Sequence, residues 1–491
     1  MRPLCVSLFA ATLLLAAPAV AQCTPVWSAL GAGADDAVQA VARLANGDLV
    51  VGGTFAAAGG VPCSRIARWN GSAWSPLGAG VDIEVRALAV LQNGDLVAGG
   101  YFWTAGGIAC NHVARWDGGT WHALGGGMDN WVTALAVLPN GDLVAGGSFT
   151  TAGGVPCSRV ARWNGSAWSP LGFGVDNWVT ALAVLPNGDL VAGGNFTVAS
   201  TVVANRIARW NGSAWYALGS GTDAWVDALE VSSTGVLFAG GLFANAGGVP
   251  CSRVAAWAGG SWSPLGVGIG NRVRTLAVLP NDDLVAGGSF TTAGGFAANR
   301  LARWDGSAWR TLGSGVDSQV AALAVVPNGD LVVGGGFAHA GGAPAAAVAR
   351  WSPPCRPNVV AYGTGCVGGG GLNQLTVLTP PWDGGTYRVR ATGLPPLGFV
   401  MSVLGFGQIA VPWPTLFPEG QAGCDLLATP DRLDVLTASA GAAELAMQVA
   451  RSPSLVGQTV FHQVVTFELN AQLQVTTITA TNGLAATVGG Y

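Results

Sequence analysis

The chain has 491 residues, of which 10% are charged, and its net charge is −4. All 22 basic residues are arginine and they form no cluster, which argues against a nucleic-acid partner because phosphate binding requires concentrated positive charge. The length is sufficient for two domains.

The N-terminal segment, residues 1–21, predicts a cleaved secretory signal peptide. Val6–Ala17 is almost wholly apolar, and an Ala-Val-Ala sequence before Gln22 fits the small-residue pattern of a cleavage site. The apolar run is shorter than the roughly 20 residues that span a bilayer. A lipoprotein would have a small residue, not Gln22, before Cys23. We therefore expect a secreted protein, extracellular or in the cell envelope, with no membrane span.

A unit of 47 residues repeats seven times between residues 22 and 355, without insertion or deletion. Each copy contains the tryptophan of a Trp-x-x-Leu-Gly motif, a second tryptophan that usually follows arginine, and a phenylalanine that follows a glycine pair. The three series are Trp27, Trp74, Trp121, Trp168, Trp215, Trp262 and Trp309; Trp69, Trp116, Trp163, Trp210, Trp257, Trp304 and Trp351; and Phe55, Phe102, Phe149, Phe196, Phe243, Phe290 and Phe337.

Each repeat contains four strand-like runs, which in the third copy are Val132–Leu138, Leu143–Phe149, Val160–Trp163 and Ala167–Leu171. An Asn-Gly pair, typical of a tight hairpin, follows the first run, and Thr151–Gly154 begins a loop after the second. Four short strands in a period of about 40 to 50 residues predict an all-β, seven-bladed β-propeller over residues 22–355. Glycine is too frequent for a helical solenoid, and a parallel β-helix has shorter coils without paired hairpin turns.

The two ends of the repeat region complement each other. Trp27–Leu30 is a lone fourth strand, and the last copy ends after its third strand at Trp351. We therefore expect the N-terminal strand to complete the seventh blade. Cys23 and Cys355 each lie four residues outside these tryptophans, which predicts a disulfide that clasps the ring.

Residues 356–491 lack the repeat and predict a β-sandwich-like C-terminal domain. Strand-like runs at Gly385–Ala391, Thr459–Leu469 and Leu473–Ala480 are punctuated by glycine and proline. No convincing amphipathic helix appears in this region, and Gly441–Ala450 is the segment most compatible with a short one.

The other cysteines form two groups. Cys366 and Cys424 are natural partners for a second disulfide in an exported chain. The remaining four share one position in different blades, where equivalent points are about 10 Å apart or more, beyond the reach of a disulfide or of shared metal ligation. We expect buried thiols and no metal site at Cys63, Cys110, Cys157 and Cys251.

The pattern Trp-x-x-Leu-Gly, Asn-Gly-Asp-Leu-Val-Ala-Gly-Gly-x-Phe and Arg-Trp-Asn-Gly resembles secreted bacterial propellers of the delta-60 and kelch-like repeat type over residues 26–351. The glycine pair, Gly146-Gly147 in the third copy, is the kelch-like element. The resemblance implies the fold but little about activity, because such families include adhesion modules, interaction scaffolds and oxidases. From Tyr362 onward the chain resembles C-terminal β-modules appended to exported bacterial proteins.

The sequence contains no recognisable catalytic constellation. A copper radical oxidase, the catalytic relative of kelch propellers, needs histidine and tyrosine ligands and a cysteine. The four histidines of this chain are scattered along the sequence, at His112, His122, His339 and His462. A Gly-x-Ser-x-Gly elbow, a zinc-spaced histidine pair and a calcium loop are all missing. We expect a protein that is not an enzyme and has no cofactor.

The loop that enters each blade varies at one position. It carries Asp35, Asp82, Asp129, Asp176, Asp223, Gly270 and Asp317, and two residues later Ala37, Glu84, Trp131, Trp178, Trp225, Arg272 and Gln319. Such loops gather around one mouth of the central channel of a propeller. One interpretation is that the aspartates cap turns and the tryptophans cover loops. The other is a carbohydrate platform of Trp131, Trp178 and Trp225, with Asp129, Asp176 and Asp223 as hydrogen-bond acceptors.

These observations favour a secreted, non-catalytic binding or adhesion propeller, monomeric, whose partner is an extracellular glycan or protein. Two alternatives stay open. Low charge and the second β-domain fit a structural protein of the cell envelope. An enzyme acting on extracellular carbohydrate would need a carboxylate pair or a metal that the sequence does not display.

Overall fold

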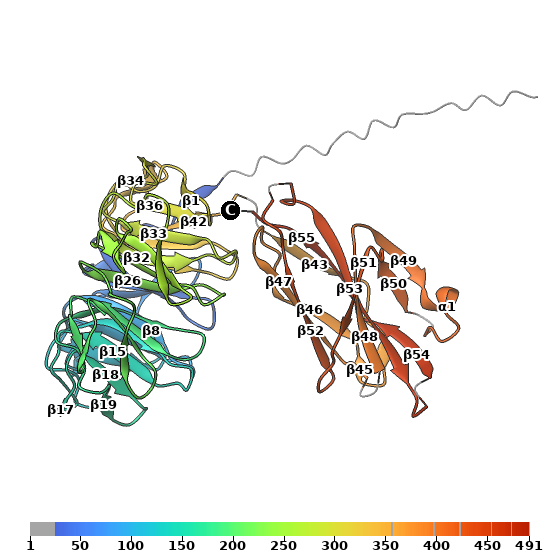
Figure 1. The fold of residues 1–491 in the computed structure, drawn as a ribbon, viewed down its shortest axis with the longest axis horizontal. Helices are drawn as coiled ribbons and strands as arrows, with labels where there is room; N and C mark the ends of the chain where they lie inside the picture. The colour runs from blue at the N-terminus through green and yellow to red at the C-terminus, as the bar shows by residue number, and fades with distance from the viewer. Residues whose placement is uncertain are drawn as a thin grey trace, which may run out of the picture.

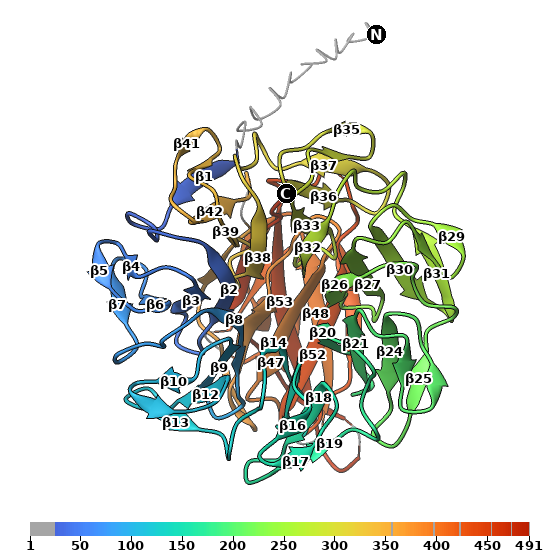
Figure 2. The same ribbon diagram turned by 90° about the vertical axis from the view of Figure 1, so that its left-hand side faces the viewer.

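The computed structural model describes residues 25–354, 357–395, 398–421, 424–452, 454–472 and 474–490. In this range seven four-stranded antiparallel sheets form a ring, and a second group of sheets follows it (Figures 1 and 2). The predicted fold class, a seven-bladed β-propeller followed by a β-sandwich, is confirmed. The predicted signal peptide lies outside the described residues, within which no helix is long and apolar enough to cross a membrane.

Every blade is a meander of four antiparallel strands, the first of which lines the central channel (Figure 2). The first strands are β2 (Val38–Arg43), β8 (Val85–Val90), β14 (Val132–Val137), β20 (Val179–Val184), β26 (Val226–Val231), β32 (Val273–Val278) and β38 (Val320–Val325). The second strands are β3 (Leu49–Gly53), β9 (Leu96–Gly100), β15 (Leu143–Gly147), β21 (Leu190–Gly194), β27 (Leu237–Gly241), β33 (Leu284–Gly288) and β39 (Leu331–Gly335). The third strands are β6 (Ile66–Trp69), β12 (Val113–Trp116), β18 (Val160–Trp163), β24 (Ile207–Trp210), β30 (Val254–Ala258), β36 (Leu301–Trp304) and β42 (Val348–Ser352). The fourth strands are β7 (Trp74–Pro76), β13 (Trp121–Ala123), β19 (Trp168–Pro170), β25 (Trp215–Ala217), β31 (Ser261–Pro264), β37 (Trp309–Thr311) and β1 (Val26–Ala29).

The predicted Asn-Gly turns connect the first two strands of a blade. In the third blade Gly141 has a φ of +90°, a left-handed conformation that favours glycine, and the Asn140 side chain accepts a hydrogen bond from the Asp142 backbone N–H at 3.1 Å. Strand β15, which follows this turn, is buried along its whole length. Because neighbouring blades cover both of its faces, its sequence is apolar throughout and does not alternate.

A short hairpin separates the second and third strands, where we predicted only a loop. In the third blade Thr151 and Ala152 pair with Pro156 and Val155 around a glycine pair. Runs of two residues are too short to be recognised as strands by their hydrophobic pattern. The hairpins are β4 (Ala57–Ala58) with β5 (Val61–Pro62), β10 (Thr104–Ala105) with β11 (Ile108–Ala109), β16 (Thr151–Ala152) with β17 (Val155–Pro156), β22 (Val198–Ala199) with β23 (Val202–Val203), β28 (Asn245–Ala246) with β29 (Val249–Pro250), β34 (Thr292–Ala293) with β35 (Phe296–Ala297), and β40 (His339–Ala340) with β41 (Ala343–Pro344).

Neighbouring blades are joined by the repeated aromatic residues. The phenylalanine of each repeat is buried, with Phe149 fully enclosed, and it packs between blades. The indole N–H of Trp168 donates a hydrogen bond to the Leu124 carbonyl oxygen of the preceding blade at 2.9 Å. The equivalent bond, between residues 44 apart in sequence, is also made by Trp74, Trp121, Trp215, Trp262 and Trp309. Each tryptophan therefore adds both apolar burial and a directional bond to its blade interface.

The N-terminal strand closes the ring, as predicted. Strand β1 pairs with β42, with Trp27 opposite Trp351, and completes the seventh blade. The indole N–H of Trp27 donates to the Leu312 carbonyl oxygen at 3.2 Å, which supplies the last of the interblade bonds. The predicted Cys23–Cys355 clasp falls on residues outside the described range and stays a prediction.

The described cysteines fall into the two groups expected. Cys366 and Cys424 form a disulfide in the C-terminal region. The other four are buried free thiols, and burial raises the pKa of each, which lowers their reactivity; they are Cys63, Cys110, Cys157 and Cys251.

The C-terminal region is a sandwich of two main sheets. Side chains from both sheets, among them Tyr387, Val389, Val400 and Val464, share one core. The six-stranded sheet contains β43 (Asn358–Tyr362), β55 (Gly483–Thr487), β53 (Thr459–Leu469), β48 (Gly398–Gly405), β51 (Arg432–Leu436) and β54 (Val475–Ala480). The three-stranded sheet contains β46 (Gln374–Thr379), β47 (Thr386–Thr392) and β52 (Ala442–Gln448). The smaller elements are β44 (Val367–Gly368), β45 (Gly371–Leu372), β49 (Gln408–Pro412), α1 (Trp413–Leu416) and β50 (Asp425–Ala428).

The segment Gly441–Ala450, which was the one most compatible with a short helix, is not helical. Its residues form strand β52, which pairs with β47 along its whole length, from Ala442 opposite Thr392 to Gln448 opposite Thr386. Alanine, glutamate and leucine favour helix locally, but strand pairing and the burial of Ala443 in the sandwich core override that preference.

Arg451 connects the C-terminal sandwich to the propeller. Its guanidinium donates to the carbonyl oxygens of Asp305 at 2.7 Å and Asn281 at 3.3 Å, and lies 2.6 Å from the Asp283 carboxylate. Asn281 and Asp283 belong to the turn that follows β32 in the sixth blade. The C-terminal region therefore covers the face of the ring that carries these turns, and the opposite face stays open (Figure 2).

One half-buried carboxyl group gives the propeller a pH-dependent stability. Glu230 in β26 occupies a position where every other blade has alanine, and burial raises its pKa to about 7. The folded state then holds the proton more tightly than the unfolded state, so this stabilisation is complete below pH 4.5 and is lost as the pH rises through 7. We expect Glu230→Gln to raise the free energy of unfolding by about 2 kcal/mol at pH 8 and to leave it unchanged at pH 4.

Urea denaturation of Glu230→Gln and the wild type across this pH range measures the effect. Glu444→Gln, at an exposed position paired with Arg388, serves as the control and is expected to change the pH profile little. Parallel pH profiles for the wild type and Glu230→Gln would contradict the prediction.

Candidate functional site

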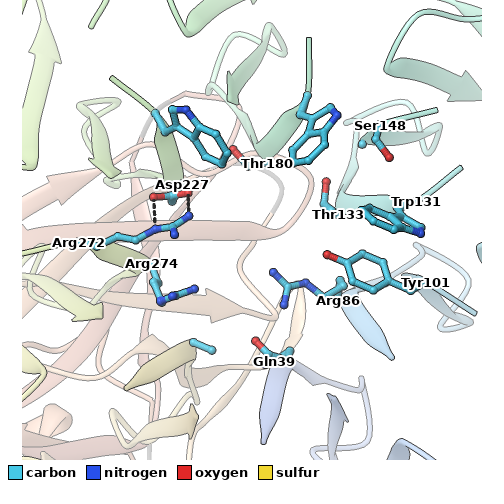
Figure 3. Close-up of a pocket in the computed structure, with 14 residues that line it drawn as sticks. Gln39, Arg86, Tyr101, Trp131, Thr133, Ser148, Thr180, Asp227, Arg272 and Arg274 are labelled. Carbon is cyan, nitrogen blue, oxygen red and sulfur yellow. Dashed lines mark hydrogen bonds and ion pairs between the residues drawn. The ribbon is translucent and has the colours of Figure 1, made fainter. Parts of the chain in front are cut away.

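A cavity of about 290 Å³ opens at the mouth of the central channel (Figure 3). Apart from Gly147 at the end of β15, each lining residue occupies one of three positions in its blade: the residue before the first strand, the second residue of that strand, or the residue after the second strand. These positions lie at the end of the first strands opposite the Asn-Gly turns, so the cavity opens on the face that the C-terminal region leaves free.

An aromatic arc of Tyr101, Trp131, Trp178 and Trp225 lines one side of this cavity. The ring centroids of Tyr101 and Trp131 are 4.5 Å apart, those of Trp131 and Trp178 6.4 Å, and those of Trp178 and Trp225 6.2 Å. Trp131 is 39% and Trp178 43% exposed, whereas the core tryptophan Trp168 is 5% exposed. The structure thus brings together the three tryptophans predicted as a platform and leaves two of them open to solvent.

An arginine wall of Arg86, Arg272 and Arg274 lines another side of the cavity (Figure 3). Asp227 accepts two hydrogen bonds from Arg272, at 2.8 and 2.6 Å, and Glu84 pairs with Arg86 at 2.9 Å. The guanidinium carbon of Arg272 lies 5.9 Å from the ring centroid of Trp225, which joins the wall to the arc.

Two threonines between these walls serve the scaffold. The Thr133 hydroxyl donates to the Val179 carbonyl oxygen at 2.6 Å, and the Thr180 hydroxyl to the Val226 carbonyl oxygen at 2.5 Å. Each bond crosses from one blade to the first strand of the next. The tryptophans of adjacent blades are therefore carried on strands that hydrogen bonds hold in register.

The three predicted aspartates do not line the cavity. Asp176 accepts hydrogen bonds from the backbone N–H groups of Thr197 and Val198 at 2.8 and 3.0 Å, and Asp129 and Asp223 make the equivalent bonds in their own blades. Burial acts to raise the pKa of these carboxyl groups, but the hydrogen bonds outweigh it and the pKa of each is lowered. Their carboxylates fix the loop that begins the small hairpin.

Two of the three variable positions that line the cavity were not predicted from the sequence. The second residue of the first strand is Gln39, Arg86, Thr133, Thr180, Asp227, Arg274 and Ala321, and the residue after the second strand is Thr54, Tyr101, Ser148, Asn195, Leu242, Ser289 and Gly336. The first of these series lies two residues after the tryptophan position, and side chains two apart on a strand share a face. Polar residues that vary inside otherwise constant apolar runs were the available signal.

A second cluster of polar side chains lies inside the C-terminal sandwich. The Ser402 hydroxyl is 2.9 Å from Nε2 of His462, and the Tyr387 hydroxyl is 3.4 Å from its Nδ1. All three side chains are buried, and burial lowers the pKa of His462 to about 4, which keeps the imidazole neutral. With no access to solvent, this cluster has a structural role in the core. Within the described residues, no group of three or more metal-ligating side chains is found.

Two family descriptions match parts of the chain. Residues 120–232 match the Rax2 C-terminal beta propeller domain, and residues 44–71 match a domain of unknown function (DUF5122) described as a beta-propeller. No curated protein matches the chain. Both family matches agree with the propeller fold.

Several solved structures are similar at low sequence identity. The extracellular domain of the putative hybrid two component system BT3049 from B. thetaiotaomicron is 10% identical, with a TM-score of 0.48, over 95% of this chain and 57% of that one. PorZ, a bacterial surface component of the type-IX secretion system of Porphyromonas gingivalis, is 12% identical, with a TM-score of 0.40, over 93% of this chain and 60% of that one. The WD40 beta propeller domain of Doa1 is 15% identical, with a TM-score of 0.43, over 65% of this chain and 94% of that one. The chain spans 57% and 58% of the first two extracellular domains that it matches.

Proposed function

We propose that this protein is exported and binds carbohydrate, without catalysis, in the cavity between the aromatic arc and the arginine wall. The observation that carries the proposal is the gathering of Trp131, Trp178 and Trp225 in one accessible cavity. The C–H faces of a sugar ring stack on tryptophan, and its hydroxyl groups require a few polar partners, which Gln39 and Ser148 offer here. Asp129, Asp176 and Asp223 have a structural role in this proposal.

The position of the arc favours binding over a purely structural role. The exposed rings of Trp131 and Trp178 do not contribute to the packing between blades, which depends on other, buried tryptophans such as Trp168. The cavity also lies on the open face of the ring, where a glycan chain can approach without displacing the C-terminal region.

A glycan-array screen of the mature chain, beside Trp131→Ala/Trp178→Ala/Trp225→Ala, tests this function. We expect the wild type to bind a subset of glycans and the triple variant to lose that binding, because each lost stacking contact removes about 1 kcal/mol or more of binding free energy. The variant should keep the wild-type unfolding midpoint to within a few degrees, since Trp131 and Trp178 are partly exposed.

Phe173→Ala provides the matched control. Phe173 is 79% exposed and lies outside the cavity, so this variant removes an exposed aromatic ring without changing the arc. Glycan binding that survives in the triple variant, or that Phe173→Ala abolishes equally, would place the binding site elsewhere. Absence of binding by the wild type would contradict the proposed function.

A further inference from the structure

The three arginines of the wall differ in how they are neutralised. Arg86 pairs with Glu84, and its guanidinium carbon lies 5.6 Å from the Tyr101 ring centroid. Arg272 pairs with Asp227 through two hydrogen bonds and lies over Trp225. Both guanidinium groups therefore have an acidic partner and an aromatic ring beside them.

Arg274 has neither kind of support. Its only hydrogen bond among the described residues is from Nε to the Ser289 hydroxyl at 3.3 Å, and no carboxylate of the described chain forms an ion pair with it. Arg274 is half-buried, and its side chain lies beside those of Arg272 and Arg86 (Figure 3). Burial and the neighbouring charge of Arg272 lower its pKa, Asp227 opposes this, and Arg86 adds to the lowering.

The cavity consequently carries one uncompensated positive charge. Glu84 balances Arg86 and Asp227 balances Arg272, which leaves the charge of Arg274 facing the aromatic arc across the cavity (Figure 3). Keeping a third guanidinium in a partly buried group of like charges costs free energy unless a bound anion offsets it. A cavity in which every arginine is paired with an acid would suit a neutral sugar. In this cavity Arg274 has no such partner.

We propose that the carbohydrate bound here is acidic, and that Arg274 binds the carboxylate of a uronic acid residue while the sugar ring stacks on the aromatic arc. This inference rests on the proposed function and specifies its ligand class. The planar guanidinium matches a carboxylate in a two-bond geometry. A volume of about 290 Å³ is at the lower end for ligand sites, which suits one sugar ring of a longer chain.

The single unpaired charge also selects among anions. A carboxylate carries one negative charge and matches it, whereas the phosphate of a nucleotide, which could also stack its base on tryptophan, carries up to two. Arg274 is therefore expected to determine the preference for acidic sugars. The tryptophans are expected to supply the affinity that acidic and neutral sugars share.

The test measures the affinity of the full mature chain for oligogalacturonate, oligomannuronate and a hyaluronan tetrasaccharide, each beside its carboxyl-reduced, neutral counterpart. We expect at least one acidic oligosaccharide to bind about 10-fold to 100-fold more tightly than its reduced form, the range expected for hydrogen bonds to a charged group. Arg274→Gln should remove this difference and leave the affinity for the reduced form within about twofold.

Two further measurements separate ligand binding from a structural role. Because Arg274 has like-charged neighbours and no acidic partner, Arg274→Gln is expected to keep or raise the unfolding midpoint, which a structural arginine would lower. Arg432→Gln is the matched control: Arg432 is an exposed arginine of the C-terminal region, paired with Asp434, and its loss should not change the preference for acid.

The outcomes distinguish this inference from the proposed function. Tryptophan-dependent binding of neutral and acidic forms with equal affinity would overturn the role of Arg274 and leave carbohydrate binding intact. A preference for acid that persists in Arg274→Gln would also overturn it. Stronger binding of uridine monophosphate than of every oligosaccharide would replace the sugar by a nucleotide. No binding of any oligosaccharide would contradict both proposals.

Discussion

Replacing Gly194 with alanine is expected to destabilise the propeller and to remove glycan binding at the same time. A Cβ atom at this position would lie 2.0 Å from the Trp178 carbonyl oxygen, a distance that only a shift of the backbone can relieve. The Asn195 N–H donates to the same oxygen at 2.9 Å, so the shift would also stretch this bond. We expect the free energy of unfolding to fall by about 3 kcal/mol, the upper end for overpacking.

The loss of binding follows from the place of Trp178 in the arc. Its ring lies between those of Trp131 and Trp225, so a displaced backbone at Trp178 changes both ring spacings at once. Denaturant unfolding and glycan affinity, measured on the same folded preparation, report the two effects separately.

Two glycine variants serve as controls for Gly194→Ala. Gly335→Ala in the seventh blade creates the same contact, 2.1 Å from the Gln319 carbonyl oxygen, but away from the aromatic arc, so it should lose stability and keep binding. Gly119→Ala meets nothing closer than 3.7 Å and should change neither property. Wild-type stability of Gly194→Ala would show that the close approach does not exist in solution.

Deleting Val26–Ala29 is expected to be at least as damaging, because it opens the ring. The deletion removes β1 from the seventh blade, and with it the Trp27 side chain and its hydrogen bond to the Leu312 carbonyl oxygen. Loss of a packed tryptophan alone costs about 3–5 kcal/mol, and the strand contributes its backbone bonds in addition. We expect the propeller to unfold in one transition at a much lower denaturant concentration.

Single substitutions locate the source of this effect. Trp27→Ala should cause most of the loss, whereas Val26→Ala, at a position 55% exposed, should cause little. A deletion variant that unfolds at the wild-type midpoint would mean that the ring does not depend on its N-terminal strand.

The sequence was most informative where the repeat is strict. The seven blades, the Asn-Gly turns and closure by Trp27–Leu30 follow from local patterns that occur many times, so each copy supports the others. The small hairpins and strand β52 were missed for a different reason. Two-residue strands carry no periodic signal, and Ala442–Gln448 becomes a strand only through its pairing with Thr386–Thr392.

The candidate site shows the same division between local and non-local information. The meeting of Trp131, Trp178 and Trp225 was predictable because equivalent positions of adjacent blades must be neighbours. The partnership of Arg272 with Asp227, which leaves Arg274 without an acid, depends on side chains that reach across blades. Of the two roles that the sequence left open for the aspartates, ligand binding and turn capping, the bonds of Asp176 to Thr197 and Val198 agree with turn capping.

Closure of the ring by its first strand has a consequence for how the protein must fold. Every other blade pairs residues of a single repeat and can form as soon as that repeat has been synthesised, but β1 waits for β42, almost the whole propeller later. This contact has the largest loop to close and so is expected to form last. Until then the seventh blade exposes an unpaired edge that fits the same strand of another copy. Refolding at high protein concentration should therefore produce strand-exchanged oligomers, and refolding at low concentration should favour the closed monomer.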